Sequence, residues 1–190
     1  MALDVSDRYL RFGYPATDAQ MSKYVDMLDF EHDEVFGIFN RRLELIATAH
    51  LAHPSVAPAQ GKAVMSEFGV SVLPNARGRG FGRRLFDHAT LHARNRGVDT
   101  LFIHALSENT AMLKIARAAG ATVERSGPET DAWLKLAPDT LASHVDELVG
   151  SQRAELDYRL KRHVRQVGSI IDVIGEVTAT LGKASHVASE

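Results

Sequence analysis

Apolar and polar positions follow two different periods along residues 1–137, and the two periods alternate. Runs rich in β-branched and aromatic side chains predict strands, which we place at 8–14, 34–40, 43–53, 61–73, 100–106, 121–127 and 131–136. Stretches with apolar residues every three or four positions predict helices at 17–28, 82–97 and 109–120. The pattern therefore predicts an α/β (α+β) fold, with a mixed six- to seven-stranded sheet flanked by helices.

The pattern changes after Pro138, where no strand-like run occurs and apolar side chains recur at helical spacing as far as Leu181. We expect one long amphipathic helix, or two helices interrupted near Gly150 or Gly168. The sequence thus predicts a domain over 1–137 followed by a C-terminal helical extension over 138–190.

The apolar stripe of this extension has to be buried against something. Residues 138–190 carry six basic and eight acidic side chains and one aromatic, Tyr158, which is not the composition of a membrane-surface helix. We therefore expect the extension to pair with its copy in a two-fold homodimer. The alternative is a helix that folds back on its own domain.

Composition excludes several classes of function. The 190 residues include no cysteine, so disulfides, thiolate catalysis and cysteine-ligated zinc are ruled out. The 22 basic and 24 acidic residues leave a net charge of −2, which gives no reason to expect nucleic-acid binding. Because there is no basic leader and no apolar run of about 18 residues, we predict a cytoplasmic protein with no membrane partner. His50 and His53 lie three apart on a strand and so on opposite faces, and we predict no metal site.

A glycine- and arginine-rich loop joins the strand at 61–73 to the helix at 82–97. It consists of Arg77, Gly78, Arg79, Gly80, Phe81 and Gly82. Glycines leave backbone N–H groups unobstructed and a helix N-terminus adds partial positive charge, so the loop predicts an anion site. The alternative is a tight turn with surface arginines. The spacing matches neither the Gly-x-Gly-x-x-Gly dinucleotide motif nor the nucleotide-triphosphate loop.

This loop resembles the acyl-CoA loop of the GNAT N-acetyltransferase superfamily, Arg/Gln-x-x-Gly-x-Gly/Ala. The preceding strand "FGVSVLPNA" and the later segment "SENTAMLKIARAAGATV" also resemble the family, in the same order. The resemblance implies a GNAT fold with acetyl-CoA as co-substrate. It puts the CoA pyrophosphate against the loop from Arg77 to Gly82, the pantetheine beside Val70 and Val72, and Asn109 near the cofactor arm.

A narrower resemblance covers "SDRYLRF", "LDFEHDEVFGIF" and "SEFGVSVLPNARGRGFGRRL", which are similar to the acetyltransferase domain of bacterial protein lysine acetyltransferases. It implies an acetyl-CoA-dependent N-acyltransferase whose acceptor is a primary amine, on a protein lysine or a small molecule. The family's usual tyrosine, four residues before the helix-ending Gly120, is Ala116 here. That difference keeps a second function open, a non-catalytic acyl-CoA-binding or assembly module.

Acetyl transfer needs a base, because a protonated amine cannot attack a thioester. Glu67 stands on the strand before the loop, at the position where the lysine acetyltransferases keep a catalytic glutamate. Strand alternation puts Glu67, Gly69 and Ser71 on one face. We predict that Glu67 is the general base, and the alternative is a solvent-facing strand glutamate. An acidic run at 26–34 either borders the acceptor site or forms a solvated turn.

Overall fold

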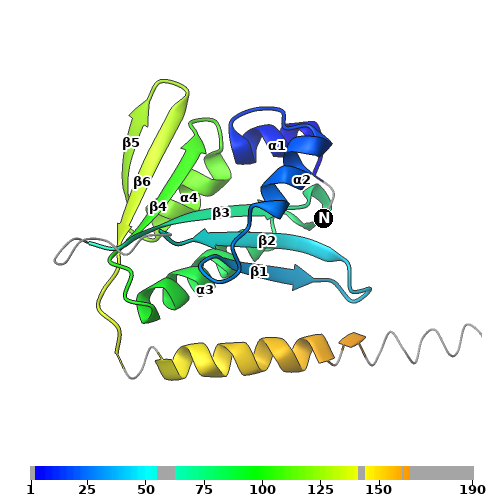
Figure 1. Cartoon of the computed structure of the whole chain (residues 1–190), viewed down its shortest axis with the longest axis vertical. Coiled ribbons are helices and arrows are strands. Elements are labelled where there is room, and N and C mark those ends of the chain that lie inside the picture. The colour runs from blue at the N-terminus through cyan, green and yellow to red at the C-terminus, as the bar shows by residue number, and fades with distance from the viewer. Residues whose placement is uncertain (1–2, 55–62, 141–143, 160, 163–190) are drawn as a thin grey trace, which may run out of the picture.

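Six strands form one sheet in the order β1-β2-β3-β4-β6-β5 (Figure 1). The computed structural model describes residues 3–54, 63–140, 144–159 and 161–162. The strands are β1 (Glu34–Phe39), β2 (Leu45–Ala52), β3 (Met65–Val72), β4 (Thr100–Leu106), β5 (Thr122–Ser126) and β6 (Glu129–Lys135). Neighbouring strands are antiparallel except β3 and β4, which run parallel. The predicted mixed sheet is confirmed, with six strands.

The helices begin and end where the sequence carries capping signals. They are α1 (Val5–Phe12), α2 (Asp18–Asp26), α3 (Phe81–Asn95) and α4 (Thr110–Ala118), with a short 3-10 turn η1 (Pro74–Ala76) and a further helix over 144–159. Thr17 and Gln20 form a reciprocal capping box at the start of α2. Gly97 and Gly120 follow α3 and α4 with φ of 73° and 86°, the left-handed conformation in which helices commonly end at glycine.

The strand predicted at 8–14 is wrong, because this segment lies in and just after helix α1. The Asp4 carboxylate accepts a hydrogen bond from the Asp7 N–H at 2.7 Å and caps the start of the helix. Gly13, with φ of 79°, ends it. These two local signals outweigh the aromatic alternation of "RYLRFGY", and the sheet therefore has six strands rather than seven.

The hydrophobic core lies between the sheet and helices α3 and α4, while α1 packs on the opposite face (Figure 1). Ala47, Ala49 and Leu51 of β2 point into the core, and Phe68 of β3 meets Phe86 of α3 edge to face with ring centres 5.1 Å apart. Residues between these core positions must point to the other face, toward α1 and α2. The sheet thus presents a second, more polar surface to those two helices.

Strands β3 and β4 pair only at their first three positions, the last of which joins Glu67 to Phe102. Beyond that point β3 continues to Val72 beside β2, and β4 continues to Leu106 beside β6. The sheet consequently opens into a V with Glu67 at its vertex, and the two diverging halves are evident in Figure 1. Helix α1 contacts both strands across this opening.

The helix over 144–159 runs along β1 and α3 (Figure 1). Glu147 contacts His92 and accepts a hydrogen bond from the Asn95 side chain, and the Tyr158 ring lies 5.6 Å from that of Phe39. The helix passes through Gly150 without a break, and Gly168 lies outside the described residues. Leu148 and Leu156 keep 66% of their surface exposed. In the part of the chain that the structure describes, no helix is long and apolar enough to cross a membrane.

Candidate functional site

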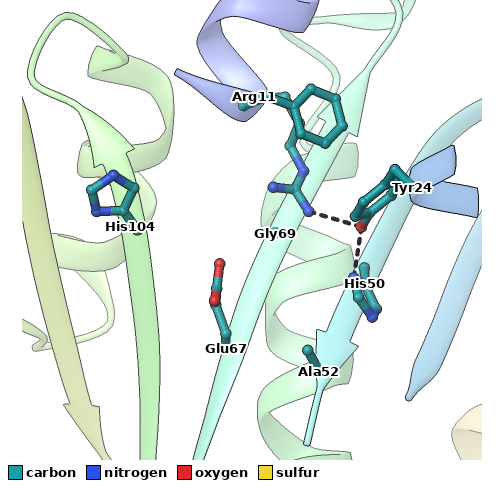
Figure 2. Close-up of a pocket in the computed structure, with 8 residues that line it drawn as sticks. Arg11, Tyr24, His50, Ala52, Glu67, Gly69 and His104 are labelled. Carbon is teal, nitrogen blue, oxygen red and sulfur yellow. Dashed lines mark hydrogen bonds between the residues drawn. The ribbon is translucent and has the colours of Figure 1, made fainter. Parts of the chain in front are cut away.

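A pocket of about 260 Å³ lies where β3 and β4 separate (Figure 2). Its floor comes from two paired strands, because His50 lies opposite Gly69 and Ala52 lies opposite Glu67. The other lining residues are Arg11 and Phe12 of α1, Tyr24 of α2 and His104 of β4. Both halves of the opened sheet and both helices on this face therefore converge on one small space.

Glu67 points into this pocket from the vertex of the V (Figure 2). It shares a face of β3 with Gly69, as strand alternation predicts, while Ser66 and Phe68 are buried on the other side. Its side chain is exposed, so the carboxylate is open to a molecule that enters the pocket. A carboxylate placed in this way is able to accept a proton from a bound amine, directly or through water.

A chain of polar contacts runs from the pocket to Asp33, the residue before β1. The Tyr24 hydroxyl lies 2.6 Å from His50 Nδ1, and His50 Nε2 lies 3.3 Å from a carboxylate oxygen of Asp33. Asp33 favours the tautomer with the proton on Nε2, so the Tyr24 hydroxyl donates to Nδ1. Burial lowers the pKa of His50 despite the nearby Asp33, and burial raises the pKa of Tyr24. At neutral pH the chain therefore consists of a protonated phenol and a neutral imidazole.

Arg11 reaches from the last turn of α1 into the same pocket (Figure 2). Its Nη2 donates to the Tyr24 hydroxyl at 3.3 Å, and its guanidinium carbon lies 5.1 Å from the centre of the Phe12 ring. Gly69 makes room for it, because a Cβ at this position would overlap the guanidinium. Among the described residues, no carboxylate lies within ion-pair distance of Arg11.

The glycine- and arginine-rich loop leads directly into the N-terminus of α3. Gly80 is the N-cap residue with φ of 77°, and no side chain caps the first turn. The N–H groups of Phe81, Gly82 and Arg83 therefore have no partner within the helix. The space around Gly78 and Gly80 is open, since a Cβ on either would meet nothing within 4 Å. An uncapped helix N-terminus beside bare glycines fits the negative charge of a phosphate group.

Arg77 turns away from the rest of this loop. Its guanidinium pairs with the buried Asp7 of α1 and donates through Nε to the Val72 carbonyl at 3.1 Å. The side chain therefore ties the end of β3 to α1. The contact of Arg77 with the CoA pyrophosphate stays a prediction.

The other predicted cofactor residues occupy two neighbouring places. Val70, Val72 and Phe81 are partly buried against the core at the end of β3 and the start of α3. Gly82 allows close packing there, because a Cβ would lie 3.3 Å from Ile115. Arg79 lies farther out, in a groove between α3, β1 and the helix over 144–159.

Asn109 links α4 to α1 beside the pocket. Its Oδ1 accepts from the Met112 N–H at 3.2 Å and so caps the start of α4. Its Nδ2 donates to the Leu10 carbonyl at 3.3 Å. One side chain therefore holds the start of α4 and the end of α1 together across the opening.

Sequence reasoning missed Arg11, Tyr24 and His50 as pocket residues. Strand alternation could have found His50, which lies on the same face of β2 as Ala52. Arg11 was not recognised as a pocket residue, because the pattern over 8–14 predicts a strand and not a helix. Of the acidic run, Asp33 reaches the pocket through His50, whereas Glu34 lies on the opposite face beside His53, His92 and Arg96.

Comparison with known proteins identifies the fold. The model of the acetyltransferase (GNAT) family matches residues 4–121. The GNAT domain of S. lividans PAT is similar in structure, with a TM-score of 0.58 and 25% identity over 70% of this chain and 79% of that one. A ribosomal-protein-alanine N-acetyltransferase from Brucella melitensis has a TM-score of 0.53 and 18% identity over 70% and 90% of the two chains, which shows a shared fold. No curated protein matches the sequence.

We expect Asn109→Ala to lower the free energy of unfolding by about 1 kcal/mol, because it removes an N-cap. Asn109→Asp keeps the acceptor for the Met112 N–H but loses the donor to Leu10, so it should cost less than half as much. Urea denaturation followed by circular dichroism measures both. Equal losses for the two variants would mean that the bond to Leu10, and not the cap, carries the effect.

Proposed function

Because the chain belongs to the acetyltransferase (GNAT) family, we propose that it transfers an acetyl group from acetyl-CoA to a primary amine. The observation that carries this proposal is the position of Glu67, an exposed carboxylate at the vertex between β3 and β4, in a pocket on the strand that leads to the glycine-rich loop. A carboxylate, an opening in the sheet and the uncapped start of α3 therefore follow one another in order along β3 and the turn after it.

Acetyl-CoA fits the residues around the opening. The pyrophosphate would take hydrogen bonds from the uncapped N–H groups at the start of α3, where Gly80 leaves its approach clear. The pantetheine would follow the end of β3 past Val70 and Val72, and Asn109 stands on the far side of the same opening. When bound there, acetyl-CoA supplies an activated acyl group with a thiolate as leaving group.

The role proposed for Glu67 follows from the charge of the acceptor. A primary amine is mostly protonated at neutral pH, with a pKa of about 10.4 for lysine, and has to lose a proton before its nitrogen attacks. The Glu67 carboxylate takes that proton. The new C–N bond forms at the acetyl carbonyl carbon, and the C–S bond then breaks to release CoA.

The thiolate would leave without a dedicated acid from α4. Ala116 replaces the tyrosine usual at that position and is fully buried. A non-catalytic CoA-binding module of the same fold is the second function, and this residue is the observation that favours it. Release of free thiol in the presence of an amine separates the two, since only the enzyme produces it.

A homodimer through the C-terminal helix is part of the proposal. The described part of this helix contacts its own domain through Glu147 and Tyr158, yet leaves Val145, Leu148 and Leu156 at least 60% exposed. A stripe of exposed apolar side chains on one helix supports burial against a second copy. The division between 1–137 and 138–190 likewise stays a prediction.

Gly80→Glu should weaken acetyl-CoA binding by at least tenfold, because a carboxylate would occupy the phosphate cradle on a backbone with φ of 77°. Gly127→Glu is the matched control, since Gly127 also has a positive φ, 62°, and open space but lies at the distant β5–β6 turn. Titration calorimetry with CoA measures the affinities. Unchanged affinity in Gly80→Glu would contradict the proposed cofactor site.

Glu67→Gln should lower kcat about a hundredfold or more, the range for loss of a general base, while CoA affinity stays unchanged. Glu124→Gln, an exposed carboxylate on β5, is the control for loss of one negative charge. Thiol release with a panel of primary amines is the readout. Near-normal turnover in Glu67→Gln would assign Glu67 a structural role.

Light scattering in solution should give a mass near twice the 20.8 kDa of one chain. Replacing the exposed Leu148 and Leu156 by Asp should reduce it to the mass of a single chain, because two charges would have to be buried in the interface. A single-chain mass for the wild type would reject the dimer, and a dimer in the double variant would reject these side chains as its contact.

A further inference from the structure

The Arg11 guanidinium is a half-buried cation that lies against the rings of Phe12 and Tyr24 and has no carboxylate partner among the described residues. It has five N–H donors, yet its one described hydrogen bond goes to the neutral Tyr24 hydroxyl, and no carboxylate of the described residues pairs with it. Withdrawing a charge from water without a counter-charge is unfavourable. The guanidinium also lies in the pocket rather than on the surface, in space that Gly69 leaves free. A ligand that brings an anion would therefore bind favourably at this point.

Glu67 lies at the other end of the same pocket, with the opposite charge. Figure 2 shows the Arg11 guanidinium beside Gly69 and the Glu67 carboxylate on the same side of β3. Gly69 and Glu67 are two residues apart on the strand, a spacing of roughly 7 Å. Arg11 and Glu67 do not form an ion pair with each other, so the pocket keeps a positive end and a negative end.

We propose that this pocket binds a zwitterionic acceptor, a small amino acid whose carboxylate pairs with Arg11 while its ammonium group faces Glu67. This inference rests on the proposed acetyltransferase function and names its acceptor class. The volume of about 260 Å³ suits a small molecule of this kind, since roughly nine water molecules occupy the same volume in the liquid. A lysine of a protein would bring its ammonium group without a carboxylate beside it and would leave Arg11 unpaired.

The reaction of such an acceptor balances with the groups at hand. Glu67 takes one proton from the ammonium group, the nitrogen forms a C–N bond to the acetyl carbonyl carbon, and the C–S bond to CoA breaks. As the C–S bond breaks, the nitrogen gives its second proton through water to the thiolate. The products are an N-acetylated amino acid and free CoA thiol, and the proton held by Glu67 passes to solvent. Arg11 holds the carboxylate before and during the reaction, so its contribution belongs to acceptor binding and to KM rather than to kcat.

The test compares amino acids with their amides, which lack the carboxylate. Glycine, L-alanine and β-alanine are paired with their amides, and a lysine peptide with blocked ends stands for a protein acceptor. The wild type should show a kcat/KM about tenfold or more higher for each amino acid than for its amide, the factor expected from a charge-assisted hydrogen bond. Arg11→Met should remove that preference, because it should raise KM for the amino acids at least tenfold more than it raises KM for the amides.

Two further variants keep the test independent of a folding defect. Gly69→Ala retains Arg11 but puts a Cβ where the guanidinium lies, so it should reduce the same preference. Arg125→Met removes an exposed arginine on β5 and should leave the preference unchanged. Circular dichroism melting curves establish that each variant is folded.

Each other outcome overturns the proposal in a distinguishable way. Preference for the amides or for the blocked lysine peptide would reject the zwitterionic acceptor and leave the acetyltransferase function standing. An equal loss with all acceptors in Arg11→Met would assign Arg11 to the reaction or to the fold of the site. If no amine releases thiol, the proposed function itself fails, and calorimetry with glycine and β-alanine on the CoA-loaded protein then decides whether Arg11 binds a carboxylate at all.

Discussion

The site depends on one feature of the sheet, the loss of pairing between β3 and β4 after Glu67. Two parallel strands that separated with nothing between them would leave backbone polar groups without partners. Three contacts hold helix α1 across this opening: Arg77 pairs with Asp7, Asn109 bonds to Leu10, and Arg11 lies over Gly69. These contacts make the opening a stable feature of the fold. It gives access to the edge of β3 and to the Glu67 carboxylate at the vertex.

Two regions around this opening differ in their charges. The start of α3 offers uncapped N–H groups next to Gly80, which suits the phosphates of a CoA molecule. The pocket over Gly69 combines the guanidinium of Arg11, the neutral pair of Tyr24 and His50, and the carboxylate of Glu67. The thioester would lie between the two regions. The charges that the acceptor needs then follow from the two groups that have no ion-pair partner among the described residues of the pocket, Arg11 and Glu67.

Sequence reasoning reached the elements and the loop because their signals are local. Asn109 and Gly120 mark the limits of α4 within a dozen residues, and alternation along β3 correctly put Glu67 and Gly69 on one face. Arg11 and Tyr24 could not be found in this way, since their place in the pocket depends on how two helices cross the sheet. The wrong strand prediction at 8–14 shows that a periodic pattern alone does not decide the structure of a short segment. There the helix cap at Asp4 outweighs the alternation of aromatic residues.

A crystal structure of the protein with bound acetyl-CoA tests the central claim most directly. The account predicts the pyrophosphate against the N–H groups at the start of α3, the pantetheine between β3 and β4, and the acetyl carbonyl facing Glu67. Acetyl-CoA bound instead in the groove between α3, β1 and the helix over 144–159, with no part of it between β3 and β4, would contradict it.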